Sequence, residues 1–252
     1  MNQNIFTAQH GEDILLAEIF NRRHGTCIEV GGYDGVNLSN TFFFERIGWD
    51  CTIVEPMPKF CEKIRQERKC KVVEAAASSQ AGEIDFFIAE GVEVLSTSSQ
   101  RESDLKRIQI AGAETQKITV KAMTLDEILE NQGIKNIDFI SIDVEGDELS
   151  VLHGFSLEKY KPRIIIVEDN DVAVDYSVQN HLVKCNYRRF KRTGCNEWYA
   201  HKSDSLVTNF SKMTASAKGV VPFIKGFTKT YMPAPLQTLI RKSINSNLKK
   251  SA

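Results

Sequence analysis

Short apolar runs alternate along this chain with segments in which apolar residues recur every three or four positions. The runs predict strands, and the segments with helical spacing predict helices. The strands are expected at 26–30, 51–54, 71–77, 83–89, 118–122, 137–142 and 164–167. The helices are expected at 5–22, 42–47, 58–65, 125–129, 149–152 and 175–183. Because strands and helices alternate, the pattern predicts an α/β domain with a doubly wound, mostly parallel sheet.

Three segments carry more specific signals. Residues 187–191 and 197–201 flank the turn Thr193-Gly194-Cys195-Asn196 and read as a β-hairpin, so the sheet should close with an antiparallel final strand. Thr124 and Glu127 have the spacing of a capping box and should begin a helix. Residues 90–116 are polar and weakly patterned, which indicates a functional loop or a mobile lid.

A glycine-rich turn follows the first predicted strand and carries the clearest sign of a ligand. Gly31, Gly32 and Gly35 allow a tight turn and a close approach of the backbone to a ligand, although an ordinary structural turn would have the same glycines. Glu55 ends the second strand, where a carboxylate can accept hydrogen bonds from a ribose diol. Since the turn lacks the GxGxxG spacing of dinucleotide sites, the sequence favours S-adenosylmethionine over NAD.

Acidic residues also follow the two later strands. Ligands of doubly wound sheets bind at the carboxyl ends of the strands, so these residues should meet at one edge. The candidate catalytic residues are Asp143, Glu145 and Glu168. Asp143, Asp169 and Asn170 offer oxygen ligands of the kind that a Mg²⁺ ion prefers. Glu29 is either a cofactor ligand or a structural carboxylate that accepts backbone N–H bonds.

Composition and charge bear on compartment and partners. No apolar run has the length of a signal peptide or a membrane span, and the six cysteines lack metal-type spacing, so a reduced, cytoplasmic protein is expected. Nothing indicates nucleic-acid binding. Residues 202–252 carry nine Lys or Arg against one acid, Asp204, which divides the chain into a domain at 1–201 and a basic tail at 202–252. The tail could contact an anionic membrane peripherally, pack on the domain or on a second copy in a homo-oligomer, or stay solvated.

Several pieces of the sequence, in their order, resemble the FkbM family of S-adenosylmethionine-dependent O-methyltransferases. The pieces are AQHGED, IEVGGYDGVNLSNT, GWDCTIVEP, TLDEIL, IDFISIDVEGDELSVLHGF and PRIIIVE. The resemblance covers about residues 5 to 200 and implies a class I methyltransferase, Rossmann-like fold. It also implies methyl transfer to a hydroxyl, often of a sugar in a glycan or glycolipid or of a secondary metabolite.

The resemblance further implies roles for individual residues. Those that would hold the methionine end of the cofactor are Glu29, Gly31, Gly32 and Gly35, while Glu55 would bind the ribose. Pro56 and Met57 would pack near the adenine, which Glu74, Ala75 and Ala76 would border. Asp143 would face the sulfonium and the acceptor. Two competing hypotheses are an NAD-dependent enzyme and a non-catalytic nucleoside-binding protein on the same fold.

Overall fold

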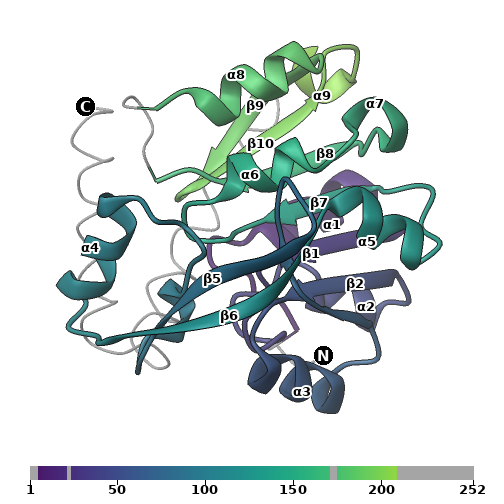
Figure 1. The fold of residues 1–252 in the computed structure, drawn as a ribbon. Coiled ribbons are helices and arrows are strands. Elements are labelled where there is room, and N and C mark those ends of the chain that lie inside the picture. Colours follow the sequence, from purple (N-terminus) through teal and green to yellow (C-terminus); the bar gives the residue numbers. More distant parts are fainter. Residues whose placement is uncertain (1–4, 22–23, 171–174, 209–252) are drawn as a thin grey trace.

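A seven-stranded sheet forms the centre of the computed structural model, which describes residues 5–21, 24–170 and 175–208 (Figure 1). Its strand order is β3-β2-β1-β7-β8-β10-β9. The strands are β1 (Thr26–Val30), β2 (Asp50–Glu55), β3 (Lys71–Glu74), β7 (Phe139–Ile142), β8 (Ile164–Glu168), β9 (Tyr187–Thr193) and β10 (Asn196–His201). Only β10 pairs antiparallel with its neighbours, β8 and β9. The predicted doubly wound sheet with an antiparallel final strand is confirmed.

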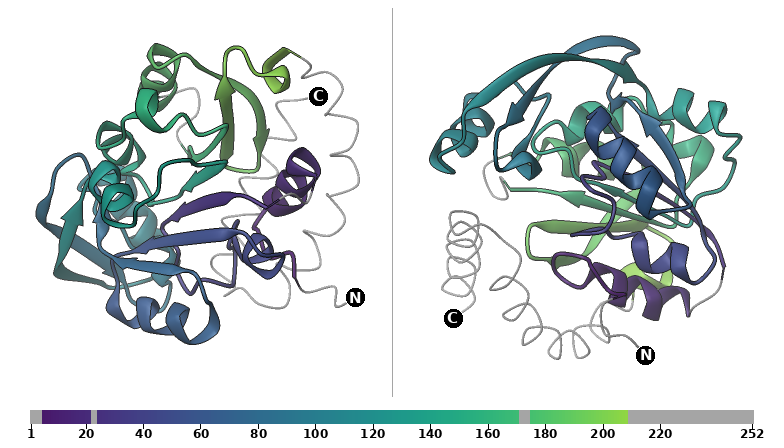
Figure 2. Two further views of the ribbon diagram at one scale, coloured as in Figure 1. Left: turned by 90° about the vertical axis from the view of Figure 1, so that its right-hand side faces the viewer. Right: turned by 90° about the horizontal axis from the view of Figure 1, so that it is seen from below.

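Helices cover both faces of this sheet (Figure 2). On one face, α1 (Glu12–Phe20) and α2 (Phe42–Arg46) pack against side chains such as Cys27 and Phe139. On the other face, Ile28 and Ile140 pack against α5 (Leu125–Asn131), α6 (Glu148–His153), α7 (Leu157–Tyr160) and α8 (Ser177–Lys184). Neighbouring strand residues thus enter opposite cores, as the period of two requires. The helix α3 (Pro58–Glu67) packs on β2 and β3.

A second, three-stranded sheet in the order β4-β6-β5 lies beside the main one. Its strands are β4 (Ala76–Ala77), β5 (Gly82–Ala89) and β6 (Thr115–Met123). The segment between β5 and β6 contains the 3₁₀ helix η1 (Glu93–Leu95) and the helix α4 (Glu102–Ile110). The prediction of a loop over 90–116 was therefore wrong. Leu95 and Ile108 are buried in a small core with Ala89, and this tertiary packing orders a segment whose local apolar pattern is weak.

Smaller differences concern the ends of elements. The first helix begins at Glu12 rather than near residue 5, and Ala8 instead forms a bridge with Leu38. The capping box of Thr124 and Glu127 is present as predicted. No helix within the described ranges is long and apolar enough to span a membrane.

Residues that follow position 201 still pack against the domain. The short helix α9 (Ser205–Thr208) follows β10, and Leu206 and Val207 pack against the core on the α1 face. Arg163 Nε donates to Asp204 Oδ2 at 3.0 Å. The rest of the predicted basic tail, 209–252, lies outside the described residues.

Candidate active site

The glycine turn after β1 is held between the tips of β2 and β7. Gly31 N donates to the carbonyl of Val54 at 2.9 Å, and a Cβ on Gly31 would lie 1.7 Å from the carbonyl oxygen of Asp143. Gly31 also has φ +85°, which side chains rarely adopt. A Cβ on Gly32 would lie 2.1 Å from Ile53 Cγ2. Packing within the protein therefore requires these glycines, and the turn lies at the point where the strand order reverses, the usual ligand crevice of such sheets.

Glu55 ends β2 directly beneath this turn. Glu55 is 5% exposed, and its carboxylate accepts hydrogen bonds from the backbone N–H of Tyr33 at 2.9 Å and of Met57 at 3.0 Å. Burial raises the pKa of Glu55 to about 7, although these bonds lower it in part. Each carboxylate oxygen can accept more than one hydrogen bond, so the group can also receive the hydroxyls of a ligand.

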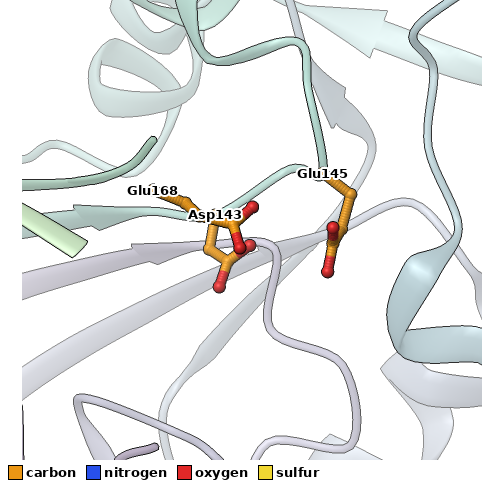
Figure 3. Close-up of side chains that lie close together, drawn as sticks. All are labelled: Asp143, Glu145 and Glu168. Atoms are coloured by element: carbon orange, nitrogen blue, oxygen red, sulfur yellow. The ribbon is translucent and has the colours of Figure 1, made fainter. Parts of the chain in front are cut away.

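Asp143, Glu145 and Glu168 converge beside the turn (Figure 3). One ligand oxygen from each lies within 4.8 Å of the others, although Glu168 comes from β8 and the other two follow β7. Burial and then the neighbouring Glu168 and Glu145 raise the pKa of Asp143 well above its ordinary value. Burial likewise raises the pKa of Glu145 to about 8. These carboxyl groups therefore bind protons more readily than exposed ones do.

Two further side chains complete the cluster, and the sequence had not indicated either. Arg107 Nη2 on α4 lies 2.6 Å from Glu145 Oε2. Burial lowers the pKa of Arg107, but the surrounding carboxylates, Glu145 first, raise it above its ordinary value. Glu148 Oε1 accepts from Gly146 N at 2.9 Å and fixes the turn after β7. The segment predicted as a lid thus supplies the cation that faces the acidic strand tips.

Comparison with known proteins assigns the family. Residues 29–189 match the family described as the methyltransferase FkbM domain. The chain belongs to the FkbM methyltransferase family. Its fold is that of a methyltransferase, as the sequence resemblance had implied.

Solved structures with a similar fold are distant in sequence. One is the methyltransferase FkbM from Methylobacillus flagellatus KT, with 14% identity and a TM-score of 0.45, covering 71% of this chain and 44% of that one. Another is a ribosomal protein L11 methylase from Lactobacillus delbrueckii subsp. bulgaricus, with 9% identity and a TM-score of 0.44, covering 75% and 76%. This chain therefore spans less than half of the Methylobacillus structure. No curated protein matches the sequence.

Glu29 of this FkbM family member is engaged by the protein itself. It accepts hydrogen bonds from Ser39 Oγ at 2.7 Å, Asn40 N at 2.6 Å and Thr41 Oγ1 at 2.6 Å. Arg68, whose side chain is fully buried, lies 3.7 Å away and also binds Glu45 at 2.8 Å. These contacts favour the structural interpretation of Glu29. Its contact with the cofactor stays a prediction.

The residues expected around the adenine of the cofactor fall into two groups. Met57 and Ala76 are buried in one small core beside β5 and β6, Ala75 is also buried, and Pro56 is half-buried. Glu74 is exposed, and its carboxylate accepts from both terminal nitrogens of Arg65 at 3.1 Å. The Glu74 carboxylate is thus engaged with Arg65 at the surface, and its place beside the adenine stays a prediction.

The structure groups Asp143 with Glu145 and Glu168 rather than with Asp169, which was expected to complete a Mg²⁺ site together with Asn170. Asp169 N donates to the carbonyl of Cys195 at 2.9 Å, and Asn170 is exposed. Successive residues of a strand point to opposite faces, so Glu168 and Asp169 cannot both point toward Asp143. Glu168 does so because it shares a face of β8 with Ile164 and Ile166.

The AQHGED segment is attached to the turn between β9 and β10. Glu12 Oε1 accepts from Thr193 Oγ1 at 2.6 Å and from Asn196 Nδ2 at 2.9 Å. His10 Nε2 lies 3.7 Å from Cys195 Sγ, and burial together with Glu168 and Asp143 raises the pKa of that thiol. The segment before α1 therefore packs beside the acidic cluster, a long-range contact that the sequence left without a role.

Proposed function

We propose that this protein is an S-adenosylmethionine-dependent O-methyltransferase that methylates a hydroxyl of a sugar, in a glycan or glycolipid, or of a secondary metabolite. The observation that supports it is the position of the Gly31 turn between Glu55 and Asp143. A ribose-binding carboxylate and an acidic cluster thereby lie on either side of one backbone turn.

The residues present fit the cofactor. S-adenosylmethionine supplies a methyl group on a positively charged sulfonium sulfur. Glu55 would accept hydrogen bonds from the ribose hydroxyls while keeping those from Tyr33 and Met57. The carboxylates of Asp143, Glu145 and Glu168 provide the negative charge that a sulfonium and an ammonium group prefer nearby.

An oxygen acceptor is supported by the proton affinity of the cluster. A sugar hydroxyl is a weak nucleophile at neutral pH and needs a base as it reacts. Asp143 has a pKa raised by burial and by Glu168, so it holds a proton more readily than an ordinary carboxylate does. Asp143, next to Glu168, would take the hydroxyl proton, and Arg107 would limit the repulsion between the carboxylates.

Calorimetric titration with S-adenosylmethionine and with its demethylated product tests the cofactor, with NAD as the control ligand. We expect heat of binding from the first two and none from NAD. The acceptor is then sought by incubating the full chain with the methyl-labelled cofactor and with glycan or metabolite extracts. Label on an oxygen supports the proposal, whereas label only on nitrogen or carbon, or binding of NAD alone, contradicts it.

A further inference from the structure

Glu168 has an oxygen without a protein partner in a place where such an oxygen is costly. The residue is 6% exposed, and its Oε2 is buried with no hydrogen-bond partner within 5–21, 24–170 and 175–208. Nearly all buried polar groups in proteins have a partner, which can be an ion or an ordered water. A buried carboxylate oxygen without a protein partner is therefore a place for an ordered water or an ion, and its charge favours a cation.

The direction of this side chain indicates where such a ligand would lie. Glu168 points toward Asp143 and Glu145, and one oxygen from each of the three lies within 4.8 Å of the others (Figure 3). Oxygens that ligate one ion at 2.0–2.6 Å can be at most about 5 Å apart, so the observed spacing suits a shared ion. Arg107 contacts Glu145 Oε2, and no Lys or Arg is paired with Asp143 or Glu168 among the ion pairs found in the described ranges.

We propose that Asp143, Glu145 and Glu168 bind one divalent cation, Mg²⁺ or Mn²⁺, and that the open positions of this ion hold the acceptor hydroxyl. An all-oxygen set excludes a preference for soft metals, and three carboxylates leave about three of six positions for water and acceptor. The ion would lower the pKa of the bound hydroxyl, whose proton would then leave to solvent instead of passing to Asp143. This second role rests on the proposed function, but ion binding does not.

Titration with Mn²⁺ alone tests the site, because the electron paramagnetic resonance signal of free Mn²⁺ is lost on binding. The wild-type chain is compared with Glu168→Gln, which removes one ligand charge at nearly constant volume, and with Glu145→Gln. Asp169→Asn is the matched control, since Asp169 is the next residue but lies outside the cluster. Each titration is run with and without the demethylated cofactor, and circular dichroism verifies the fold of every variant.

We expect one Mn²⁺ per wild-type chain, displaced by Mg²⁺, with affinity at least tenfold lower in Glu168→Gln and unchanged in Asp169→Asn. If Glu168→Gln does not fold, the tenfold loss of Mn²⁺ affinity is expected of Glu145→Gln instead. Absence of binding up to millimolar Mn²⁺, or an equal loss in Asp169→Asn, overturns the proposed site. Binding of S-adenosylmethionine measured in EDTA separates the two proposals, because it can persist when no metal binds.

Discussion

Arg68 lies beneath the glycine turn with its Nη1 3.7 Å from Glu29 Oε2 and 2.8 Å from the carbonyl oxygen of Gly35. Its side chain is fully buried, and it also reaches Ser39 and Thr41. The arginine therefore ties β1 and the segment after the turn to the end of α3. A buried charge with this many partners supports the shape of the site without facing the cofactor.

Replacement of Arg68 should destabilise the fold strongly. Arg68→Met leaves the buried Glu29 without its cation, and breaking a buried ion pair on one side costs about 3–5 kcal/mol. Lys59→Met is the control, because Lys59 forms a largely exposed pair with Glu93, and such pairs contribute below about 1 kcal/mol. Urea unfolding followed by circular dichroism measures both. Similar free energies of unfolding for the two variants would contradict the role of Arg68.

Gly31→Ala should disrupt the site for a steric reason rather than a conformational one. The new Cβ would meet the carbonyl oxygen of Asp143 at 1.7 Å, so the tips of β1 and β7 must separate. Gly91→Ala is a matched control, since Gly91 has φ +79° against +85° at Gly31 but nothing within 4 Å of its Cβ. We expect a small loss of melting temperature in Gly91→Ala and a larger one in Gly31→Ala, with loss of cofactor binding only in the latter. Equal losses of melting temperature in the two variants would mean that backbone strain, and not the contact with Asp143, causes the loss of stability.

Cofactor affinity should rise with pH through the titration of Glu55. Its pKa of about 7 is raised by burial, whereas ribose hydroxyls donate to the charged carboxylate. Binding of S-adenosylmethionine must therefore remove a proton below pH 7, and affinity should increase from pH 6 to 8 by up to about tenfold per unit below the pKa.

The matched variant is Glu55→Gln, which has no charge at this position. We expect its binding free energy for S-adenosylmethionine to be weaker by about 1.5–3 kcal/mol above pH 7, which is the contribution of hydrogen bonds to a charged group. Since Glu145 and Glu148 also titrate near neutral pH, the quantity to compare is the difference between wild type and variant at each pH. A difference that does not change with pH would remove Glu55 from the ribose site.

Asp143→Asn should abolish most methyl transfer while leaving the fold intact. The amide keeps the volume of the side chain but can neither take up the hydroxyl proton nor ligate a cation as a carboxylate does. Labelled methyl transfer to the active extract fraction measures turnover, and Asp147→Asn, a carboxylate on the same turn that accepts from Ser98, serves as the control. Near-normal turnover in Asp143→Asn would exclude this residue from the mechanism.

The basic tail should increase attraction to anionic vesicles. Residues 209–252 contain eight Lys or Arg and no acid, and each such charge near an anionic surface contributes about 1 kcal/mol. A chain ending after Thr208 keeps the packing of Leu206 and Val207 and is the proper comparison. We expect the full chain, but not the shorter one, to co-sediment with vesicles of anionic lipid at low salt. If both chains stay in the supernatant at low salt, a role of the tail in membrane binding is excluded.

The sequence by itself determined most of the strands and helices, and the edge of the sheet at which Gly31, Glu55 and Asp143 meet. Runs such as Ile164–Val167 and the glycine turn are local patterns, and the rule for strand ends then gathers Gly31, Glu55 and Asp143 without any coordinates. A local pattern suffices because a short apolar run, or apolar residues recurring at a fixed period, shows which side chains an element can bury.

Only the tertiary structure decided which charged groups meet. β8 is apolar on both faces, so its sequence has no alternation to show whether Glu168 or Asp169 points toward Asp143. Arg68 and Arg107 find their partners 39 and 38 positions away, at Glu29 and Glu145, and no spacing rule connects such pairs. The helix α4 forms because a few buried residues pack on β5, and this energy comes from contacts distant in sequence.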